Sequence, residues 1–308
     1  MRAVRNTEDG VRVVEVAAPS EEGVRVRVRS ASICGSDLHM LAMGPLPFTL
    51  GHEFGGVLAD GTPVAVDPAQ HCGSCDQCAA GAHQRCRNMV LRGVTADGGL
   101  CDEVIVPPEC VIPLPPTLDV ADSALLEPAA IAVHGLRVGA VRGDERVAVV
   151  GGGAIGLLAA GAARVLGCDV AVKARHDAQR AAVERIGASN STQGEYQVVI
   201  EAAGSASSVA DACDLAAPGA RVVLLGVWFS GDVPLPGLVS LAKELTVLPS
   251  VASNRHAGEF EQAASLLGAQ PDLVDALVTH RFGLDDAVQA FRAAASRKAG
   301  AIKIVIEP

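Results

Sequence analysis

The chain has 308 residues, 49% hydrophobic and 19% charged, so it is long enough for two domains with separate cores and is too apolar for a disordered protein. Its net charge of -10 argues against nucleic acid as a partner, because no basic stripe is available to neutralise phosphates. We expect no secretion signal and no membrane span. Nine cysteines in such a chain favour metal binding over disulfides, and a reducing cytoplasm as its location.

The first part of the chain favours β structure. Valines alternate with arginines over residues 24–29, which predicts a half-buried strand with a solvated arginine face. Further short strands are expected near 55–58, at 63–66 and at 104–106, and a helical pattern begins at Asp119.

From residue 147 the pattern alternates between strand and helix. This alternation is typical of a parallel, doubly wound α/β sheet of the Rossmann kind. Strands are expected at 147–150, 169–173, 197–202, 220–226 and about 245–249, followed by amphipathic helices at 257–268 and 284–296 and a last strand at 302–306.

A glycine-rich turn follows the strand at 147–150. Gly151, Gly153 and Gly156 fit the pattern G-x-G-x-x-G, with Ala154 and Ile155 completing the start of the next helix. The first glycine allows a tight turn, the second lets a pyrophosphate approach, and the third lets helix and strand pack closely. An ordinary glycine-rich turn is the alternative, but the flanking strand, helix and second strand favour a dinucleotide site, with free N–H groups facing the phosphates.

The end of the second strand indicates which dinucleotide is bound. An NAD site places an acidic residue there to hold the ribose 2′-hydroxyl. This chain has Arg175, nineteen residues past Gly156, with Lys173 before it and Arg180 after it. Because a guanidinium binds a 2′-phosphate that a carboxylate would repel, we predict NADP(H) in preference to NAD(H). A solvent-exposed basic strand end is the alternative.

Four cysteines form the strongest local metal signal. Cys72, Cys75, Cys78 and Cys86 stand as C-x2-C-x2-C-x7-C. Four thiolates can complete a tetrahedral zinc shell with no open position, which stabilises a lobe and does not catalyse. An iron–sulfur cluster and a run of free or disulfide-linked cysteines are the alternatives.

A second set of metal-ligating residue types is dispersed along the chain. Cys34 lies in Cys34-Gly-Ser-Asp-Leu-His39, His52 and Glu53 lie in Gly51-His-Glu-Phe-Gly-Gly56, and Glu127 lies in Leu126-Glu-Pro128. One sulfur, one imidazole and one or two carboxylates make a zinc site with an open position. The spacing alone would also fit coincidence.

Together these motifs resemble the zinc-dependent medium-chain dehydrogenase/reductase superfamily, in particular its sorbitol and threonine dehydrogenase branch. The segment Val278-Thr-His-Arg-Phe282 adds to the resemblance, which covers nearly the whole chain. It implies a β-rich GroES-like catalytic domain at 1–129, an NAD(P)-binding Rossmann domain at 130–253 and a return to the catalytic domain at 254–308.

The resemblance also implies roles for the dispersed residues. Cys34 and His52 would ligate a catalytic zinc ion, with Glu53 and Glu127 in its first or second shell. With the four-cysteine site, this makes two zinc ions per chain. Ser36 and His39 would relay the alcohol proton to bulk water, because a hydroxyl passes a proton and a histidine accepts one near neutral pH.

The predicted activity is hydride transfer between NADP(H) and a secondary alcohol or ketone, in a homodimer or homotetramer. Two alternatives remain open. One is an NAD-dependent polyol or amino-alcohol dehydrogenase, and the other is a zinc-bound interaction protein without catalysis.

Overall fold

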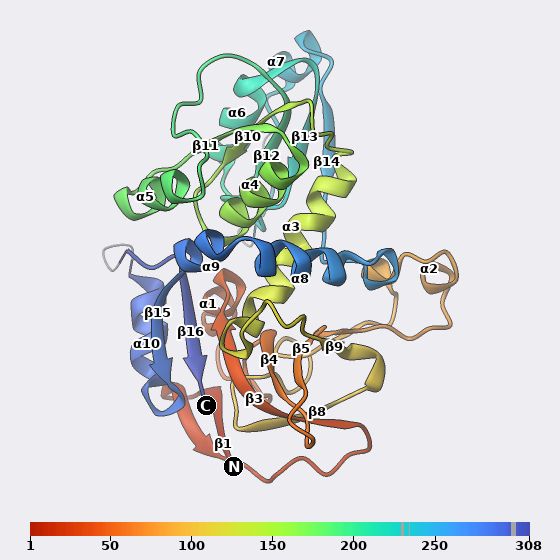
Figure 1. The fold of residues 1–308 in the computed structure, drawn as a ribbon, viewed down its shortest axis with the longest axis vertical. Helices are drawn as coiled ribbons and strands as arrows, with labels where there is room; N and C mark the ends of the chain where they lie inside the picture. The colour runs from red at the N-terminus through yellow and green to blue at the C-terminus, as the bar shows by residue number, and fades with distance from the viewer. Residues whose placement is uncertain (229–230, 234, 297–299) are drawn as a thin grey trace. The chain divides into compact units, whose positions relative to one another are not determined.

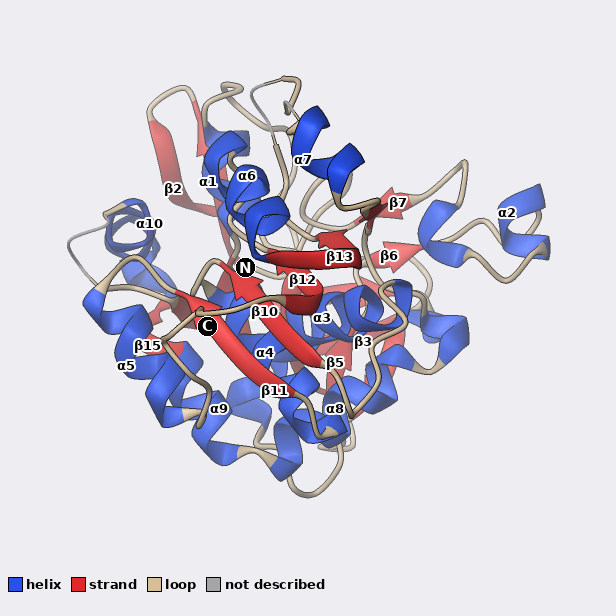
Figure 2. Ribbon diagram, turned by 90° about the horizontal axis from the view of Figure 1, so that it is seen from above, coloured by secondary structure: helices blue, strands red, loops and turns tan. Residues whose placement is uncertain are grey.

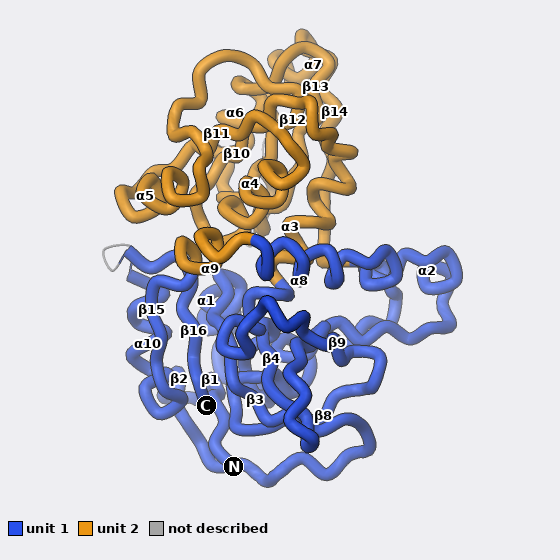
Figure 3. Tube along the Cα trace, in the orientation of Figure 1, with its two compact units in different colours: residues 1–127, 254–269, 278–308 blue, residues 128–253, 270–277 orange. Residues whose placement is uncertain are grey.

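The protein divides into two compact units. The computed structural model describes residues 1–228, 231–233, 235–296 and 300–308. Unit 1 comprises residues 1–127, 254–269 and 278–308, and unit 2 comprises residues 128–253 and 270–277 (Figure 3).

Unit 1 is built on a seven-stranded sheet. Its strands run in the order β15-β16-β3-β4-β5-β9, and β8 pairs with β3 (Figure 1). Two further two-stranded pairings, β1 with β2 and β6 with β7, complete its β structure. The elements are β1 (Arg2–Thr7), β2 (Gly10–Glu15), β3 (Val24–Ile33), α1 (Gly35–Leu41), β4 (Glu53–Val57), β5 (Pro63–Val66), β6 (Ala69–Gln70), α2 (Asp76–Ala79), β7 (Val90–Leu91), β8 (Glu103–Val106), β9 (Val111–Pro113), α8 (Glu259–Ala269), β15 (Val278–Gly283), α10 (Ala287–Ala295) and β16 (Lys303–Glu307).

The strand β3 shows why this sheet forms. Val26 and Val28 are buried in the core, whereas the arginines between them are exposed, as alternation along a half-buried strand requires. The last strand of the chain, β16, pairs antiparallel with β3, with Ile304 opposite Ile33. This pairing brings the C-terminal segment next to Cys34, which follows β3.

Unit 2 contains the predicted doubly wound sheet. Its parallel strands run in the order β11-β10-β12-β13-β14, so the winding direction reverses between β10 and β12. Ligands of such sheets bind outside the carboxyl ends of the strands at this reversal. The elements are α3 (Leu126–Val138), β10 (Arg146–Val150), α4 (Ala154–Leu166), β11 (Asp169–Lys173), α5 (Asp177–Arg185), β12 (Tyr196–Glu201), α6 (Ala206–Leu215), β13 (Ala216–Leu224), α7 (Gly237–Ala242), β14 (Thr246–Pro249) and α9 (Pro271–Leu277).

Helices cover both faces of this sheet. Figure 2 shows α4, which follows β10, and α6, which follows β12, on opposite sides of the strands. Residues 147–150 of β10 are therefore all buried, and the sequence of the strand is continuously apolar instead of alternating.

The structure differs from the expected domain division at residues 270–277. These residues were expected to return to the catalytic part with the rest of 254–308, but they belong to unit 2. Leu273 of α9 packs against Gly161 of α4, and Arg185 of α5 pairs with Asp275. The sequence pattern predicted helices at 257–268 and 284–296 and none between them, so it indicated neither α9 nor the unit that α9 covers.

Within the ranges that the structure describes, no helix combines the length and apolar character needed to cross a bilayer.

Candidate functional site

Cys34 lies where β3 gives way to α1. Its backbone is extended, with φ of -91° and ψ of 156°, and it caps the N-terminus of the helix. The backbone N–H of Cys34 donates a hydrogen bond to Oδ2 of Asp37 at 2.8 Å. This bond fixes the turn and leaves the half-buried sulfur of Cys34 available as a ligand.

His52 immediately precedes β4, and each of its ring nitrogens has a polar neighbour. Its Nδ1 lies 3.3 Å from Oδ1 of Asp37, and its Nε2 lies 3.4 Å from the hydroxyl of Ser36. Burial disfavours a charged imidazole, but the Asp37 carboxylate and the Cys34 sulfur outweigh it and hold the pKa of His52 well above its usual value. A carboxylate on Nδ1 directs Nε2 toward a metal ion.

Glu53 begins β4 and accepts hydrogen bonds from two neighbouring side chains. It is the cross-strand partner of Ser32 on β3, and the Ser32 hydroxyl donates a hydrogen bond to Glu53 Oε2. Lys303 of β16 donates to Oε1 at 2.8 Å and to Oε2 at 2.6 Å. Burial opposes ionisation of Glu53, but Lys303 and His52 lower the pKa of its carboxyl group. The pair is therefore a buried ion pair.

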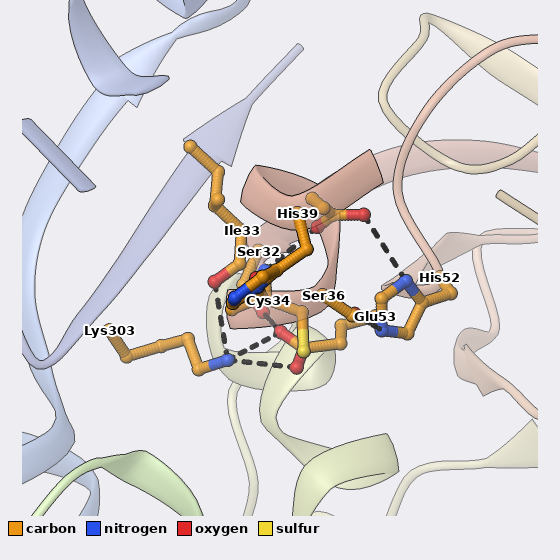
Figure 4. A network of polar contacts seen from close by, with 10 residues as sticks. Ser32, Ile33, Cys34, Ser36, His39, His52, Glu53 and Lys303 are labelled. Carbon is orange, nitrogen blue, oxygen red and sulfur yellow. Dashed lines mark hydrogen bonds and ion pairs between the residues drawn. The ribbon is translucent and has the colours of Figure 1, made fainter. Parts of the chain in front are cut away.

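Cys34, His52 and Glu53 converge (Figure 4). One ligand atom from each lies within 4.8 Å of the others. Zinc bonds to sulfur, nitrogen and oxygen measure about 2.0–2.3 Å, so two ligands of one ion lie at most about 4.6 Å apart. The donor types are those that zinc binds, and the bound of 4.8 Å on their separations is close to that limit, so the three residues are candidate ligands of one ion.

Glu127 lies outside this three-residue set. It is half-buried near the start of α3. Burial raises the pKa of its carboxyl group to about 8, with His52, Glu53 and Lys303 among the charges that act on it. The structure thus brings together three of the four predicted ligands of the catalytic site and leaves Glu127 near them.

The two predicted relay residues both come from α1. Ser36 is half-buried beside His52, whereas His39 is exposed to solvent with its Nδ1 2.8 Å from the carbonyl oxygen of Gly35. A hydroxyl near the candidate metal and an imidazole at the surface have the order that a proton route to water needs.

The four cysteines of the second candidate site also converge. The ligand atoms of Cys72, Cys75, Cys78 and Cys86 lie within 4.8 Å of one another. The Cys75 and Cys78 sulfurs are 3.6 Å apart, close to the spacing of about 3.8 Å that tetrahedral zinc–sulfur geometry gives. Hydrogen bonds, the backbone N–H of Ser74 first, lower the pKa of Cys72 to about 5, which favours the thiolate that zinc requires.

The glycine turn of unit 2 has the geometry that its pattern predicts. Gly151 has a φ of +116°, and a Cβ on Gly156 would lie 1.9 Å from the carbonyl oxygen of Gly151. The space beside Gly153 is open, and no side chain caps the N-terminus of α4. The backbone N–H groups of Ala154 and Ile155 therefore begin a helix at a point where an anion is favoured.

The three basic residues after β11 differ in their partners. Lys173 pairs with Asp211 of α6 at 2.8 Å, and Arg180 pairs with Asp177 and donates to the carbonyl oxygen of Arg175 at 2.8 Å. Arg175 is exposed, and within the described part of the chain its guanidinium contacts no hydrogen-bond or ion-pair partner. Of the three, Arg175 has the uncompensated charge.

Sequence reasoning assigned no role to Asp37 or Lys303. Asp37 lies inside the motif that contains Cys34, and its spacing of three residues from an N-cap is a signal that could have been used. Lys303 is a lysine within an apolar strand, which is unusual enough to have prompted a search for a buried partner. Nothing local in the sequence names Glu53 as that partner.

Comparison with known families agrees with this geometry. Residues 20–116 match the alcohol dehydrogenase GroES-like domain, and residues 124–307 match the glucose dehydrogenase C-terminus. The predicted fold, a GroES-like domain with a Rossmann-like parallel sheet, is confirmed.

Individual relatives cover nearly the whole chain. Galactitol 1-phosphate 5-dehydrogenase of Escherichia coli K12 is 30% identical, over 95% of this chain and 96% of its own. L-threonine 3-dehydrogenase of Deinococcus deserti is 28% identical, and the match covers 95% of this chain and 94% of that protein. The solved structure of a zinc-binding dehydrogenase from Sinorhizobium meliloti 1021 bound to NADP is 32% identical, with a TM-score of 0.89 over 100% of this chain and 99% of that one.

Proposed function

We propose that this protein interconverts a secondary alcohol and a ketone with NADP(H). The premise is its family, since the chain belongs to the sorbitol dehydrogenase-like branch of the zinc-dependent medium-chain dehydrogenase/reductase family. The observation that carries the proposal is the convergence of Cys34, His52 and Glu53 within 4.8 Å. A protein that used zinc only for structure would need the four-cysteine site and no second one.

The residues divide the work of the reaction. When bound, zinc acts as a Lewis acid on the substrate oxygen and the nicotinamide exchanges a hydride with the neighbouring carbon. Cys34 and His52 would hold the ion, and Asp37 would orient the ring of His52. Ser36 accepts the hydroxyl proton of the alcohol and His39 passes it to water, and the route runs in reverse for ketone reduction.

The cofactor site belongs to unit 2. The turn at 151–156 and the N-terminus of α4 would hold the pyrophosphate. Arg175 would hold the 2′-phosphate, because its charge is not already neutralised by a neighbouring carboxylate as those of Lys173 and Arg180 are. The relative bound to NADP is consistent with this preference.

The relatives leave the substrate class broad. Their names include a polyol phosphate and a hydroxy amino acid, so both belong in a substrate screen beside simple secondary alcohols and ketones. We also propose a homodimer or homotetramer in a reducing cytoplasm, where nine unpaired cysteines would stay reduced.

Metal analysis and turnover together test the proposal. The purified protein should contain two zinc ions per chain, one for each converging group. It should oxidise secondary alcohols with NADP⁺ or reduce ketones with NADPH, and Cys34→Ala should keep the fold, lose one zinc ion and lose turnover. A Cys34→Ala variant that turned over normally would overturn the mechanism, and a wild-type zinc content near one would remove the catalytic site.

A further inference from the structure

Lys303 begins β16 and contacts Glu53, one of the three candidate ligands of the metal site. Both Lys303 and Glu53 are almost completely buried, with 4% and 1% of their surface exposed. The Lys303 ammonium donates to both oxygens of Glu53 and approaches the carbonyl oxygen of Ile33 at 3.4 Å (Figure 4). Its three donors are thereby directed at two neighbours of Cys34.

The bonds to Glu53 limit what this carboxylate can do. An ionised carboxylate has about four lone-pair sites. Oε2 receives Lys303 and Ser32, and Oε1 receives Lys303, so one site on Oε1 remains. Glu53 cannot offer both oxygens to an ion without giving up one of these bonds.

We propose that Lys303 is a positioning residue that restricts Glu53 to at most one bond with a metal ion held by Cys34 and His52, and so keeps a coordination position open for the substrate. The inference rests on the proposed metal site. A zinc ion that catalyses needs such an open position, whereas a closed shell is structural. Lys303 also balances the carboxylate charge, so the occupied site retains positive charge for polarising the substrate oxygen.

The rival interpretation is that Lys303 only neutralises a buried carboxylate. The two interpretations predict opposite changes in zinc affinity when Lys303 is replaced. If Lys303 only supports the structure, its loss should loosen the site and weaken zinc binding. If Lys303 restrains Glu53, its loss should give the ion a stronger ligand and a fuller shell, and zinc should bind more tightly while turnover falls.

The experiment measures zinc affinity and turnover in parallel. Zinc-free wild type, Lys303→Met and Lys303→Arg are titrated with Zn²⁺ against a chromophoric chelator, and Cys34→Ala identifies which binding phase belongs to this site. For Lys303→Met we expect a dissociation constant at least about tenfold lower, because ligand charge and number set affinity, together with at least about a tenfold loss of kcat. Lys303→Arg should retain most of the wild-type behaviour, because the guanidinium also donates to both carboxylate oxygens.

Controls separate folding from ligation. Lys243→Met removes a lysine that donates to the carbonyl oxygens of Cys213, Asp214 and Ala216, so it should alter stability and leave zinc affinity unchanged. The double variant Glu53→Gln/Lys303→Met should show no tightening. If Lys303→Met does not fold, Lys303→Gln applies the same test, because its amide NH2 still donates hydrogen bonds but carries no charge.

The outcomes distinguish this inference from the proposed function. Zinc that binds normally in wild type but binds equally well or more weakly in Lys303→Met overturns the role of Lys303 and leaves the function standing. A wild-type protein with no zinc phase that depends on Cys34 overturns both.

Discussion

Oδ1 of Asp37 lies 3.3 Å from Nδ1 of His52, and the carboxylate is completely buried. The other oxygen of the same carboxylate accepts the backbone N–H of Cys34 at 2.8 Å. One side chain therefore orients two of the three converging ligand residues, although it does not belong to the ligand set itself. Mutation of partners of this kind typically lowers metal affinity or activity about 10- to 100-fold.

Asp37→Asn should weaken zinc binding at the Cys34 site by about 10- to 100-fold, because the amide keeps the shape but loses the charge that orients His52. Chelator competition measures this, and kcat at limiting zinc should fall with it. Asp76→Asn is the matched control, since Asp76 pairs with Arg87 at the surface of the cysteine lobe. Wild-type zinc affinity in Asp37→Asn would contradict the assigned role.

Cys75→Ala and Cys34→Ala should each remove one zinc ion, with different consequences. Cys75 belongs to a closed set of four sulfurs, so its loss should lower the melting temperature, by about 10 °C if it costs several kcal/mol. Cys34→Ala should change the melting temperature much less and abolish turnover. Calorimetry and metal analysis on both variants check this, and equal destabilisation by the two changes would argue against the division into structural and catalytic sites.

Features whose interacting residues lie close together in the sequence were predictable, whereas contacts between distant residues were not. The cysteine lobe and the turn at 151–156 were predictable because their geometry is local, with each ligand or glycine a few residues from the next. The pairing of Lys303 with Glu53 joins residues 250 positions apart and depends on β16 lying against β3. Spacing rules contain no information about such a contact.

The misplaced segment has a similar cause. The helix α9 lies between the predicted helices at 257–268 and 284–296 and was not expected, and the contact of Leu273 with Gly161 joins residues far apart in the sequence. The sequence singled out Arg175 by its position nineteen residues past Gly156, but it did not indicate that Lys173 and Arg180 are paired with carboxylates. Their carboxylate neighbours distinguish them in three dimensions.

Arg175→Asp should reverse the cofactor preference. Losing a charge-assisted fork to a phosphate costs about 1.5–3 kcal/mol, so the ratio of kcat/KM with NADP(H) to that with NAD(H) should fall by at least about tenfold. Lys173→Met and Arg180→Met should change the ratio less, because each residue is already paired with a carboxylate. Steady-state kinetics with both cofactors measure this ratio. An unchanged ratio in Arg175→Asp would contradict the role of Arg175 in binding the 2′-phosphate.

Asp67→Asn should stabilise the protein near neutral pH. Asp67 is 5% exposed, and burial raises the pKa of its carboxyl group to about 6, although the Ala69 N–H and Arg255 oppose the shift. Because the folded state holds this proton more tightly than the unfolded chain, ionisation between about pH 4 and pH 6 destabilises the fold, by up to about 3 kcal/mol above pH 6. The gain from Asp67→Asn should therefore grow across that window and stay level above it.

Denaturant unfolding at several pH values with zinc in excess measures the gain. In the control Asp60→Asn the sign should be opposite, since the backbone N–H of Thr62 lowers the pKa of that exposed carboxyl group. A pH-independent gain in Asp67→Asn would mean that the ionisation of Asp67 is not its source.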